Sequence, residues 1–337
     1  MDICVCGAQV PFVRGGAELL MDNLIDALRA AGHRVELVRL PTAWDRARIF
    51  DAALAWRMIP LDVDMVIATN FPSYFVQHPN KIVWLLHQHR NAYDAMDQPW
   101  SDFGTDDDAI EAQRLLTEWD SHALAEARAR FTISQVVVDR LARFNGLSST
   151  ALYHPPPLHD RLRTGPMGDY VFTATRLEAN KRPRPLVEAA ALVREPVTIK
   201  VAGSGSQRDA LATTAAAQGG PGKVELLDYV DDDALIDLFA GALGVVYAPI
   251  DEDYGYVTLQ AFLAGKPVIT AHDSGGVLEW VEDGINGFVT DGSPAGIAAA
   301  IDALHADPAL AQRMGAAGRE KVASVSWSTV VETLLGA

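Results

Sequence analysis

The feature that most constrains the fold is the regular alternation of short apolar runs with amphipathic segments along the chain. Residues 3–6 form an apolar run, residues 17–31 carry leucine and alanine at the three-to-four spacing of a helix, and residues 35–40 alternate as a strand does. A strand, a helix and a second strand in this order are typical of a parallel β-sheet with right-handed crossovers. The sequence therefore predicts an α/β fold.

The alternation is interrupted at His154-Pro-Pro-Pro157 and then starts again. Three consecutive prolines cannot lie inside a helix or a central strand, and a chain of 337 residues has the length of two domains. We predict two Rossmann-like α/β domains that face each other across a cleft, residues 1–160 and 168–320. A helix within residues 321–337 ends the chain and packs on either domain.

Each predicted domain contains further elements. In the first, strands are expected at residues 65–68, 82–86 and 131–134, and helices at 105–130 and 136–144. In the second, strands are expected at 170–173, 197–202, 224–227, 244–247, 267–270 and 287–289. Helices are expected at 184–192, 207–217, 232–240, 256–264, 276–281, 296–305, 308–319 and 328–335.

Composition excludes several classes of function. The formal net charge is −16, which argues against nonspecific binding of nucleic acid. The two cysteines, Cys4 and Cys6, point the same way on one strand and fit buried thiols in a reducing compartment. The sequence shows no signal-peptide pattern and no apolar run of the ~20 residues that span a bilayer. We expect a cytoplasmic protein. Peripheral attachment to the inner face of the membrane stays an open alternative.

Glycine-rich loops follow two predicted strands, where open α/β sheets bind their ligands. Gly15 and Gly16 precede the first helix, so their amides and the helix dipole favour a phosphate, although a simple turn explains them as well. Gly203, Ser204 and Gly205 resemble the start of a dinucleotide fingerprint, but its third glycine is absent. We expect backbone contacts to phosphate or ribose there rather than an NAD site.

Two cations follow the first strand of the second domain. Arg176 offers a bidentate guanidinium and Lys181 a compact ammonium. Such a pair neutralises the charge that a diphosphate gains when it leaves. The sequence predicts a diphosphate site at this loop, with a solvated surface pair as the alternative.

The segment from Asp251 to Ala261 joins a strand to a helix. Glu252 precedes the turn and Gln260 lies eight residues on, so that one side chain can contact a sugar while the other reaches a ribose. Asp251 and Asp253 also form a DxD pattern, a metal-binding alternative that the surrounding context disfavours. The amides at the helix N-terminus can hold a phosphate and belong to Tyr254, Gly255, Tyr256 and Val257.

Two histidines follow a strand of the first domain. His87 and His89 flank Gln88 and lie beside Arg90. An imidazole in this position can bond an acceptor hydroxyl or orient a sugar. We count both as candidate site residues, because two histidines at the carboxyl end of one strand are less often structural than one.

Together these residues resemble a known family. The second domain looks like the donor domain of retaining glycosyltransferases of the GT-B fold, glycosyltransferase family four in particular. The matching stretches are residues 176–181, 202–206, 252–260, 264–269 and 274–288, with 15–18 and 32–33 matching the N-terminal pattern of the family. Residues 71–74, 87–90 and 153–157 look like a bacterial subgroup.

The resemblance implies roles for the candidate residues. Arg176 and Lys181 would hold the diphosphate of a sugar nucleotide, and Glu252 the hydroxyls of the donor sugar. Gln260 stands where the family has a second glutamate, the ligand of the ribose, so this sequence keeps the acceptor oxygen and loses the charge. The stretch with Tyr229 and Val230 would line the pocket of the base, and the loop with Gly15 and Gly16 would close on the phosphates from the opposite domain.

The resemblance also implies a reaction. A sugar would pass from a nucleoside-diphosphate sugar to a hydroxyl of a glycan or lipid-linked glycan, with retention of configuration and without a metal or other cofactor. The expected task is bacterial polysaccharide or glycan assembly. A sugar-nucleotide epimerase or hydrolase on the same fold, or a degenerate GT-B protein that only binds a partner, are the alternatives.

Overall fold

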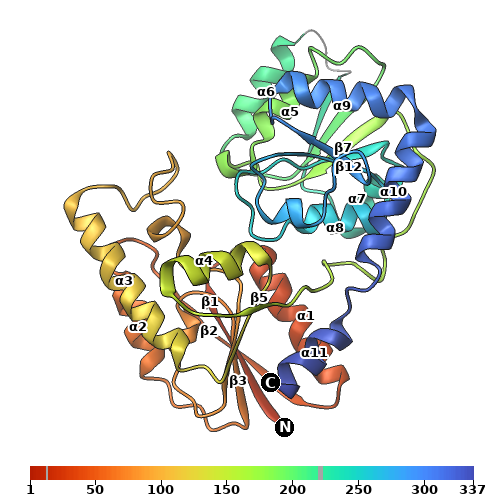
Figure 1. Ribbon diagram of the computed structural model, residues 1–337. Helices are drawn as coiled ribbons and strands as arrows, with labels where there is room; N and C mark the ends of the chain where they lie inside the picture. Colours follow the sequence, from red (N-terminus) through yellow and green to blue (C-terminus); the bar gives the residue numbers. More distant parts are fainter. Residues whose placement is uncertain (13, 219–222) are drawn as a thin grey trace. The chain divides into compact units, whose positions relative to one another are not determined.

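The computed structural model describes residues 1–12, 14–218 and 223–337 (Figure 1). The chain divides into two compact units. The first contains Met1–His154 and Val325–Ala337, and the second Pro155–Ser324. Each unit is built on a six-stranded sheet whose paired strands are parallel. The predicted α/β architecture is therefore confirmed for both halves of the chain.

The sheet of the first unit has the order β2-β1-β3-β4-β5-β6. The middle strands β3 and β4 are buried along their whole length, because helices cover both faces of the sheet. Figure 1 shows α2 and α3 on one side of it and α1 and α11 on the other. The elements are β1 Asp2–Gln9, α1 Gly16–Ala30, β2 Arg34–Pro41, α2 Ile49–Arg57, β3 Met65–Ala68, η1 Ser73–Phe75, β4 Lys81–Leu85, η2 Arg90–Ala92, α3 Asp107–Ala125, β5 Ala129–Thr132, α4 Gln135–Asn145, β6 Thr150–Ala151 and α11 Trp327–Gly336.

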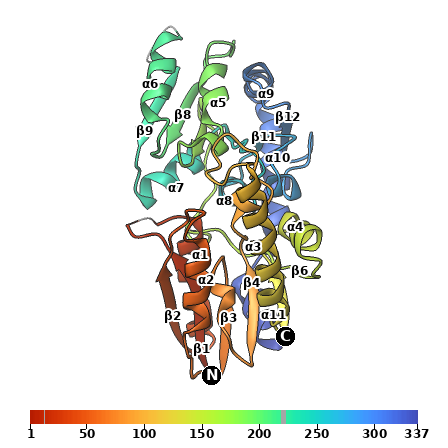
Figure 2. The same cartoon turned by 90° about the vertical axis from the view of Figure 1, so that its left-hand side faces the viewer.

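The sheet of the second unit has the order β12-β11-β10-β7-β8-β9. In Figure 2, α5 and α6 lie alongside its strands β8 and β9. The strands β10 and β11 are buried throughout. The elements are β7 Tyr170–Ala174, η3 Ala179–Lys181, α5 Pro183–Ala189, β8 Thr198–Ala202, α6 Arg208–Ala217, β9 Val224–Asp228, α7 Asp232–Gly241, β10 Gly244–Val246, α8 Tyr256–Leu263, β11 Val268–Ala271, η4 Gly276–Glu279, β12 Gly287–Thr290, α9 Pro294–Ala306 and α10 Pro308–Val322.

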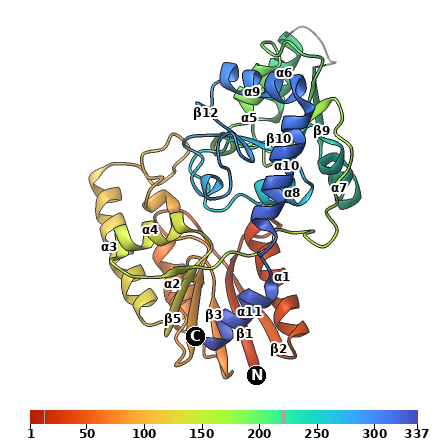
Figure 3. The same cartoon turned by 45° about the vertical axis from the view of Figure 1, so that its right-hand side comes forward.

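The C-terminal helix returns to the first unit. Helix α11 packs against α1 (Figure 3). Its first residue, Trp327, lies 6.2 Å from the ring of Trp84 on β4 and 5.8 Å from the ring of His154. These apolar contacts settle the choice that the sequence leaves open for the last helix.

The segment after the three prolines groups with the second unit. The side-chain amide of Gln260 donates to the carbonyl of Pro157 over 3.2 Å, and Arg161 pairs with Asp233 at the start of α7 over 2.5 Å. The structure thus divides the chain between His154 and Pro155, a few residues before the boundary at residue 160 that the sequence suggests.

Helix α2 is not predicted from the sequence. It is short, and its buried residues Ile49, Ala53 and Trp56 follow the spacing of a helix. The expected helix at residues 105–130 is shorter than predicted. It begins after Asp106, whose carboxylate caps it by accepting from the amide of Ala109 over 2.9 Å, and it ends at Ala125.

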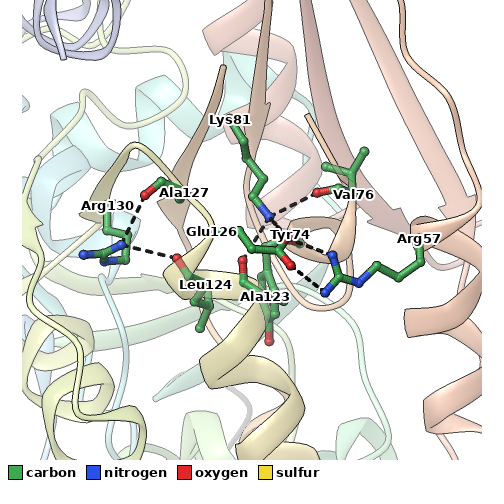
Figure 4. A network of polar contacts seen from close by, with 9 residues as sticks. All are labelled: Arg57, Tyr74, Val76, Lys81, Ala123, Leu124, Glu126, Ala127 and Arg130. Atoms are coloured by element: carbon green, nitrogen blue, oxygen red, sulfur yellow. Dashed lines mark hydrogen bonds and ion pairs between the residues drawn. The ribbon is translucent and has the colours of Figure 1, made fainter. Parts of the chain in front are cut away.

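A buried lysine ties the start of β4 to its surroundings (Figure 4). Lys81 is fully buried, and burial lowers the pKa of its ammonium. The Nζ atom donates to three backbone carbonyls and one carboxylate, those of Tyr74, Val76, Ala123 and Glu126, over 2.9–3.1 Å. Because Lys81 lies at the amino end of its strand, it braces the end of the sheet away from the ligand-binding edge.

Among the described residues, no helix combines the length and apolarity needed to cross a membrane.

Candidate functional site

The strongest candidate site lies where β7 and β10 of the second unit end. Lys181, in the turn η3 after β7, donates to the carboxylate of Glu252, which lies in the loop after β10. The hydroxyl of Tyr247, directly after β10, donates to the same carboxylate oxygen over 2.8 Å. A hollow lined by Lys181 and Tyr247 adjoins this cluster. The structure therefore brings together Lys181 and Glu252, two residues that the sequence predicts to act at one site.

The electrostatics of this cluster keep Glu252 ionised. Burial by itself raises the pKa of this carboxyl, but the charge of Lys181 and the hydrogen bonds from Lys181 and Tyr247 outweigh it and lower the pKa below its usual value. Burial and the neighbouring carboxylate raise the pKa of Tyr247 well above its usual value. At neutral pH Glu252 is therefore a carboxylate and Tyr247 a neutral phenol.

The backbone of the Glu252 loop is fixed by the loop after β11. Gly276 donates its amide to the carbonyl of Glu252 over 2.7 Å, and Asp251 donates to the carbonyl of Asp273 over 2.8 Å. Gly275 has φ +59°, and a Cβ there would lie 2.6 Å from the carbonyl oxygen of Glu252. A side chain at position 275 would therefore displace the Glu252 loop.

Arg176 lies in the same unit, in the loop after β7, and is exposed. Its positive charge acts on Tyr247, where it works against the rise of the phenol pKa. The flanking backbone packs on the glycine loop, since Leu177 donates its amide to the carbonyl of Ser204 over 2.8 Å. A Cβ on Gly203 would lie 1.9 Å from the carbonyl oxygen of Thr175. This glycine is thus required by the close approach of two loops.

The predicted phosphate contacts of the glycine loop are limited by hydrogen bonds within the protein. The amide of Gly203 donates to the carbonyl of Asp228 over 2.7 Å. The amide of Ser206 donates to the carboxylate of Glu178 over 2.9 Å. A ligand contact by Ser204 or Gly205 stays a prediction.

The candidate residues for the base lie next to this loop. Tyr229 follows β9 and is 83% exposed, and Val230 is half-buried. The backbone at Asp228 bonds Gly203 as described, so Tyr229 stands beside the glycine loop. An exposed phenol ring in this place offers a face on which a base can stack.

Helix α8 begins at the expected position. Gly255 is its N-cap residue with φ +85°, Tyr256 is its first residue, and Tyr254 and Val257 are buried. The side chain of Gln260, one turn further along, is also buried, and its Nε2 atom donates to Pro157. The Gln260 amide therefore holds the last of the three prolines, and a ribose contact by Gln260 stays a prediction.

The two aspartates of the DxD pattern differ in their surroundings. Asp253 is buried and Asp251 is half-buried with φ +48°. Across the described residues, no group of three or more His, Cys, Asp or Glu side chains has an arrangement that could hold a metal ion.

The histidines of the first unit have different environments. His87 is half-buried, and its Nδ1 atom lies 2.8 Å from the carbonyl oxygen of Gln88, so Nδ1 carries the hydrogen. His89 is 6% exposed, its ring stacks on Trp44 at 5.6 Å, and burial lowers its pKa to about 4. The burial of His89 favours a packing role. For His87 a substrate contact stays a prediction.

The first glycine loop forms the N-terminus of α1. Gly15 donates its amide to the carboxylate of Glu18 over 2.8 Å, and Arg14 pairs with Asp22 over 2.9 Å. The amide of Gly15 thus already has an acceptor in the capping glutamate. A phosphate contact stays a prediction for the amide of Gly16.

Tyr247 is the residue of the cluster that is not predicted from the sequence, where it is only the last residue of an apolar strand. Its position could have identified it, because the residue that follows a parallel strand lies at the ligand-binding edge of the sheet.

A buried carboxyl in the first unit supports the loop that follows His87 and His89. Asp120 on α3 is fully buried and accepts from the hydroxyl of Tyr93 over 2.6 Å. Asn145 donates to the same hydroxyl over 3.2 Å and accepts from Gln88 over 3.1 Å. Burial raises the pKa of Asp120 to about 7, although its hydrogen bonds oppose the rise.

This raised pKa predicts a pH-dependent stability. Between about pH 4 and pH 7 the folded chain keeps a proton on Asp120 that the unfolded chain loses, so the free energy of unfolding falls as pH rises through this window. In Asp120→Asn this loss is absent, and we expect the variant to gain about 2.7 kcal/mol of stability relative to wild type from pH 5 to pH 8, because about two pH units of the window lie in this range. Urea unfolding at both pH values measures it, with the exposed Asp108→Asn of the same helix as control. Equal pH profiles for wild type and Asp120→Asn would contradict the buried acid.

Comparison with known proteins gives a family match within the second unit. Residues 158–321 match the family described as glycosyl transferases group 1. The glycogen synthase of Mycobacterium tuberculosis is 32% identical over 175 residues, which cover 50% of this chain and 42% of that protein. The D-inositol 3-phosphate glycosyltransferase of Nocardia farcinica is 34% identical over 171 residues, which cover 48% of this chain and 38% of that protein. The chain thus spans less than half the length of these curated relatives.

Solved structures match along the whole chain. HepE from Anabaena, crystallised with UDP and glucose, has a TM-score of 0.76 at 17% identity and covers 100% of this chain and 98% of that one. Sucrose-phosphate synthase from Thermosynechococcus elongatus has a TM-score of 0.80 at 17% identity, with 99% and 97% covered. The chain therefore has the GT-B fold of two Rossmann-like domains, and its second unit carries the match to the group 1 glycosyl transferases.

Proposed function

We propose that this protein is a retaining glycosyltransferase that moves a sugar from a nucleoside-diphosphate sugar to a hydroxyl of a glycan or lipid-linked glycan. The observation that carries the proposal is the cluster of Lys181, Glu252 and Tyr247 at the carboxyl end of the second sheet. It lies inside the segment that matches the group 1 glycosyl transferases. The relatives of that segment are themselves named as transferring enzymes.

The cations of the site bind and activate the leaving group. When the bond between the anomeric carbon and the diphosphate oxygen breaks, the diphosphate gains negative charge. Arg176 is exposed and can turn its fork toward the phosphates, whereas Lys181 is held in place by Glu252. Fixed positive charge at the departing oxygen stabilises the transition state without reorganisation of solvent.

Glu252 orients the donor sugar. One of its carboxylate oxygens accepts from both Lys181 and Tyr247, which leaves the other for a sugar hydroxyl. A carboxylate that is bound in this way is a poor nucleophile, because its charge is already stabilised. The arrangement therefore fits front-face attack by the acceptor, with the departing phosphate taking the proton of the acceptor hydroxyl.

The remaining donor contacts surround this cluster. Gln260 would accept from a ribose hydroxyl through its side-chain oxygen, while its nitrogen holds Pro157. Tyr229 would stack on the base, and the start of α8 would hold phosphate oxygens. HepE was crystallised with UDP, which supports a nucleoside diphosphate as the ligand of this fold.

The acceptor and the setting are proposed from the resemblance. We assign recognition of the acceptor hydroxyl to the first unit, with His87 as the candidate residue, and bacterial polysaccharide or glycan assembly as the task. We propose that the reaction needs neither a metal nor another cofactor, since Arg176 and Lys181 supply the charge. We further propose that the protein acts in the cytoplasm, where it reaches lipid-linked acceptors at the membrane from the inner face.

The test of the proposal is the dependence of turnover on an acceptor. With a sugar nucleotide and a mixture of glycan acceptors, we expect release of the nucleoside diphosphate and a new anomeric signal of the same configuration as the donor. Release that does not change on adding acceptors would favour a hydrolase. A changed sugar that remains on the nucleotide would identify an epimerase, and a protein that binds the nucleotide without turnover would be a non-catalytic partner.

A further inference from the structure

One arginine beside the candidate site contacts several loops at once. Arg182 follows Lys181 directly and has φ +49°, a left-handed backbone conformation that is costly for residues other than glycine. Its side chain is only 15% exposed. A long cationic side chain in this state has lost most of its hydration, so its contacts within the protein must compensate.

The guanidinium of Arg182 joins loops that follow neighbouring strands. Its Nη2 atom donates to the carbonyl of Pro249, after β10, over 3.1 Å, and to the carboxylate of Asp273, after β11, over 2.6 Å. A Cβ on Gly292, which follows β12, would lie 2.6 Å from the Nη1 atom of Arg182. Arg182 itself follows β7. The guanidinium is thus packed among the loops of β7, β10, β11 and β12, which are consecutive in the sheet.

The loops that Arg182 joins carry the residues of the candidate site. The carbonyl of Pro249 also accepts from the hydroxyl of Ser274 over 2.8 Å, and the amide of Ile250 donates to the carbonyl of Asn180 over 2.8 Å. These bonds and the one from Asp251 to Asp273 connect the loops that carry Lys181 and Glu252, whose side chains contact each other. The planar fork of arginine can hold two acceptors in fixed directions, which the ammonium of lysine cannot do.

We propose that Arg182 is a positioning residue of the donor site, which holds the loops of Lys181 and Glu252 in register through Pro249 and Asp273. This inference rests on the proposed function for its effect on ligand binding, and on the structure alone for its effect on the loops. Arg182 acts through its neighbours and does not itself contact the diphosphate. Loss of its guanidinium therefore loosens the loops after β10 and β11 and weakens binding of a nucleoside diphosphate.

The first test concerns the loops without any ligand. Hydrogen exchange at the amides of Ile250, Asp251 and Gly276 is compared in wild type, Arg182→Ala and Arg182→Lys. We expect at least tenfold faster exchange in Arg182→Ala and an intermediate rate in Arg182→Lys. Arg184→Ala is the matched control, because it removes the same charge from an exposed position of α5. Unchanged exchange in Arg182→Ala would overturn the inference.

The second test separates positioning from direct contact with the anion. Binding of UDP, GDP, ADP and TDP is measured by calorimetry, and the one that wild type binds is carried through the variants. We expect at least tenfold weaker binding in both Arg182→Ala and Asp273→Asn, with Arg184→Ala unchanged. If Arg182 contacted the diphosphate, removal of the acidic Asp273 would strengthen binding, and that result would overturn the inference.

The two tests keep the two proposals apart. If wild type binds none of the four nucleotides, the proposed function fails, while hydrogen exchange still decides whether Arg182 holds the loops. If wild type binds one of them and Arg182→Ala binds it equally well, the proposed function stands and the positioning role fails. Should Arg182→Ala not fold, Arg182→Lys and Asp273→Asn carry both measurements.

Discussion

Lys181→Ala is expected to lower turnover of the sugar nucleotide by roughly 10²-fold or more, equivalent to about 3 kcal/mol of transition-state stabilisation. The reason is twofold. The variant removes a cation that would meet the departing diphosphate, and it leaves the half-buried carboxylate of Glu252 without its ionic partner. Release of nucleoside diphosphate, followed at saturating sugar nucleotide, measures the loss.

Arg176→Ala is the companion variant, with a loss of similar size if the guanidinium holds the same diphosphate. The control is Lys200→Ala, because Lys200 also pairs with a glutamate of the second unit, Glu225, at 3.3 Å. We expect Lys200→Ala to keep nearly the rate of wild type. Near-normal turnover in both Lys181→Ala and Arg176→Ala would show that the diphosphate lies elsewhere.

The second large effect is expected for Glu252→Ala, again on the order of 10²-fold in kcat. This variant removes the acceptor of the sugar hydroxyls and also the carboxylate that orients Lys181. Because the two side chains act as one unit, the double variant Lys181→Ala with Glu252→Ala is expected to be about as slow as either single variant. A double-mutant cycle on kcat measures this coupling.

Two further variants serve as comparisons for Glu252→Ala. Glu225→Ala removes a more exposed member of a lysine–glutamate pair and is expected to have little effect on rate. Tyr247→Phe removes one hydrogen bond to Glu252 and is expected to cost about 1 kcal/mol. Additive losses in the double variant of Lys181 and Glu252 would mean that the two residues act independently, against the observed contact.

Much of the fold could be predicted from the sequence, because the spacing of apolar residues agrees with the positions of the glycines and prolines that end helices and strands. The strand at Met65–Ala68 is predicted from its apolar run, and the helix that begins at Tyr256 from the alternation of strands and helices. The short helix α2 was missed, since nine residues between two loops give too few periods for the pattern to stand out. The partner of the last helix depended on contacts of Trp327 with distant residues.

The candidate site was predictable only in part. The meeting of Lys181 and Glu252 follows from the rule that loops after parallel strands share one edge. The burial of individual side chains could not be predicted in the same way. His87 and His89 look alike in sequence, but the aromatic rings around His89 come from separate segments, Trp44, Phe71 and Phe103. The role of Arg182 was equally hidden, because Pro249 and Asp273 lie far from it along the chain.

The donor site is tested most directly by calorimetric titration of the purified protein with UDP, GDP, ADP, TDP and NAD in the presence of EDTA. We expect selective binding of one nucleoside diphosphate without metal, lost in Lys181→Ala and kept in Lys200→Ala. At a hundredfold excess over its Kd, that ligand is expected to stabilise the fold by about 2.7 kcal/mol. Binding only after Mg²⁺ or Mn²⁺ is restored would favour a metal site at Asp251 and Asp253, and failure to bind any nucleoside diphosphate would contradict the donor site altogether.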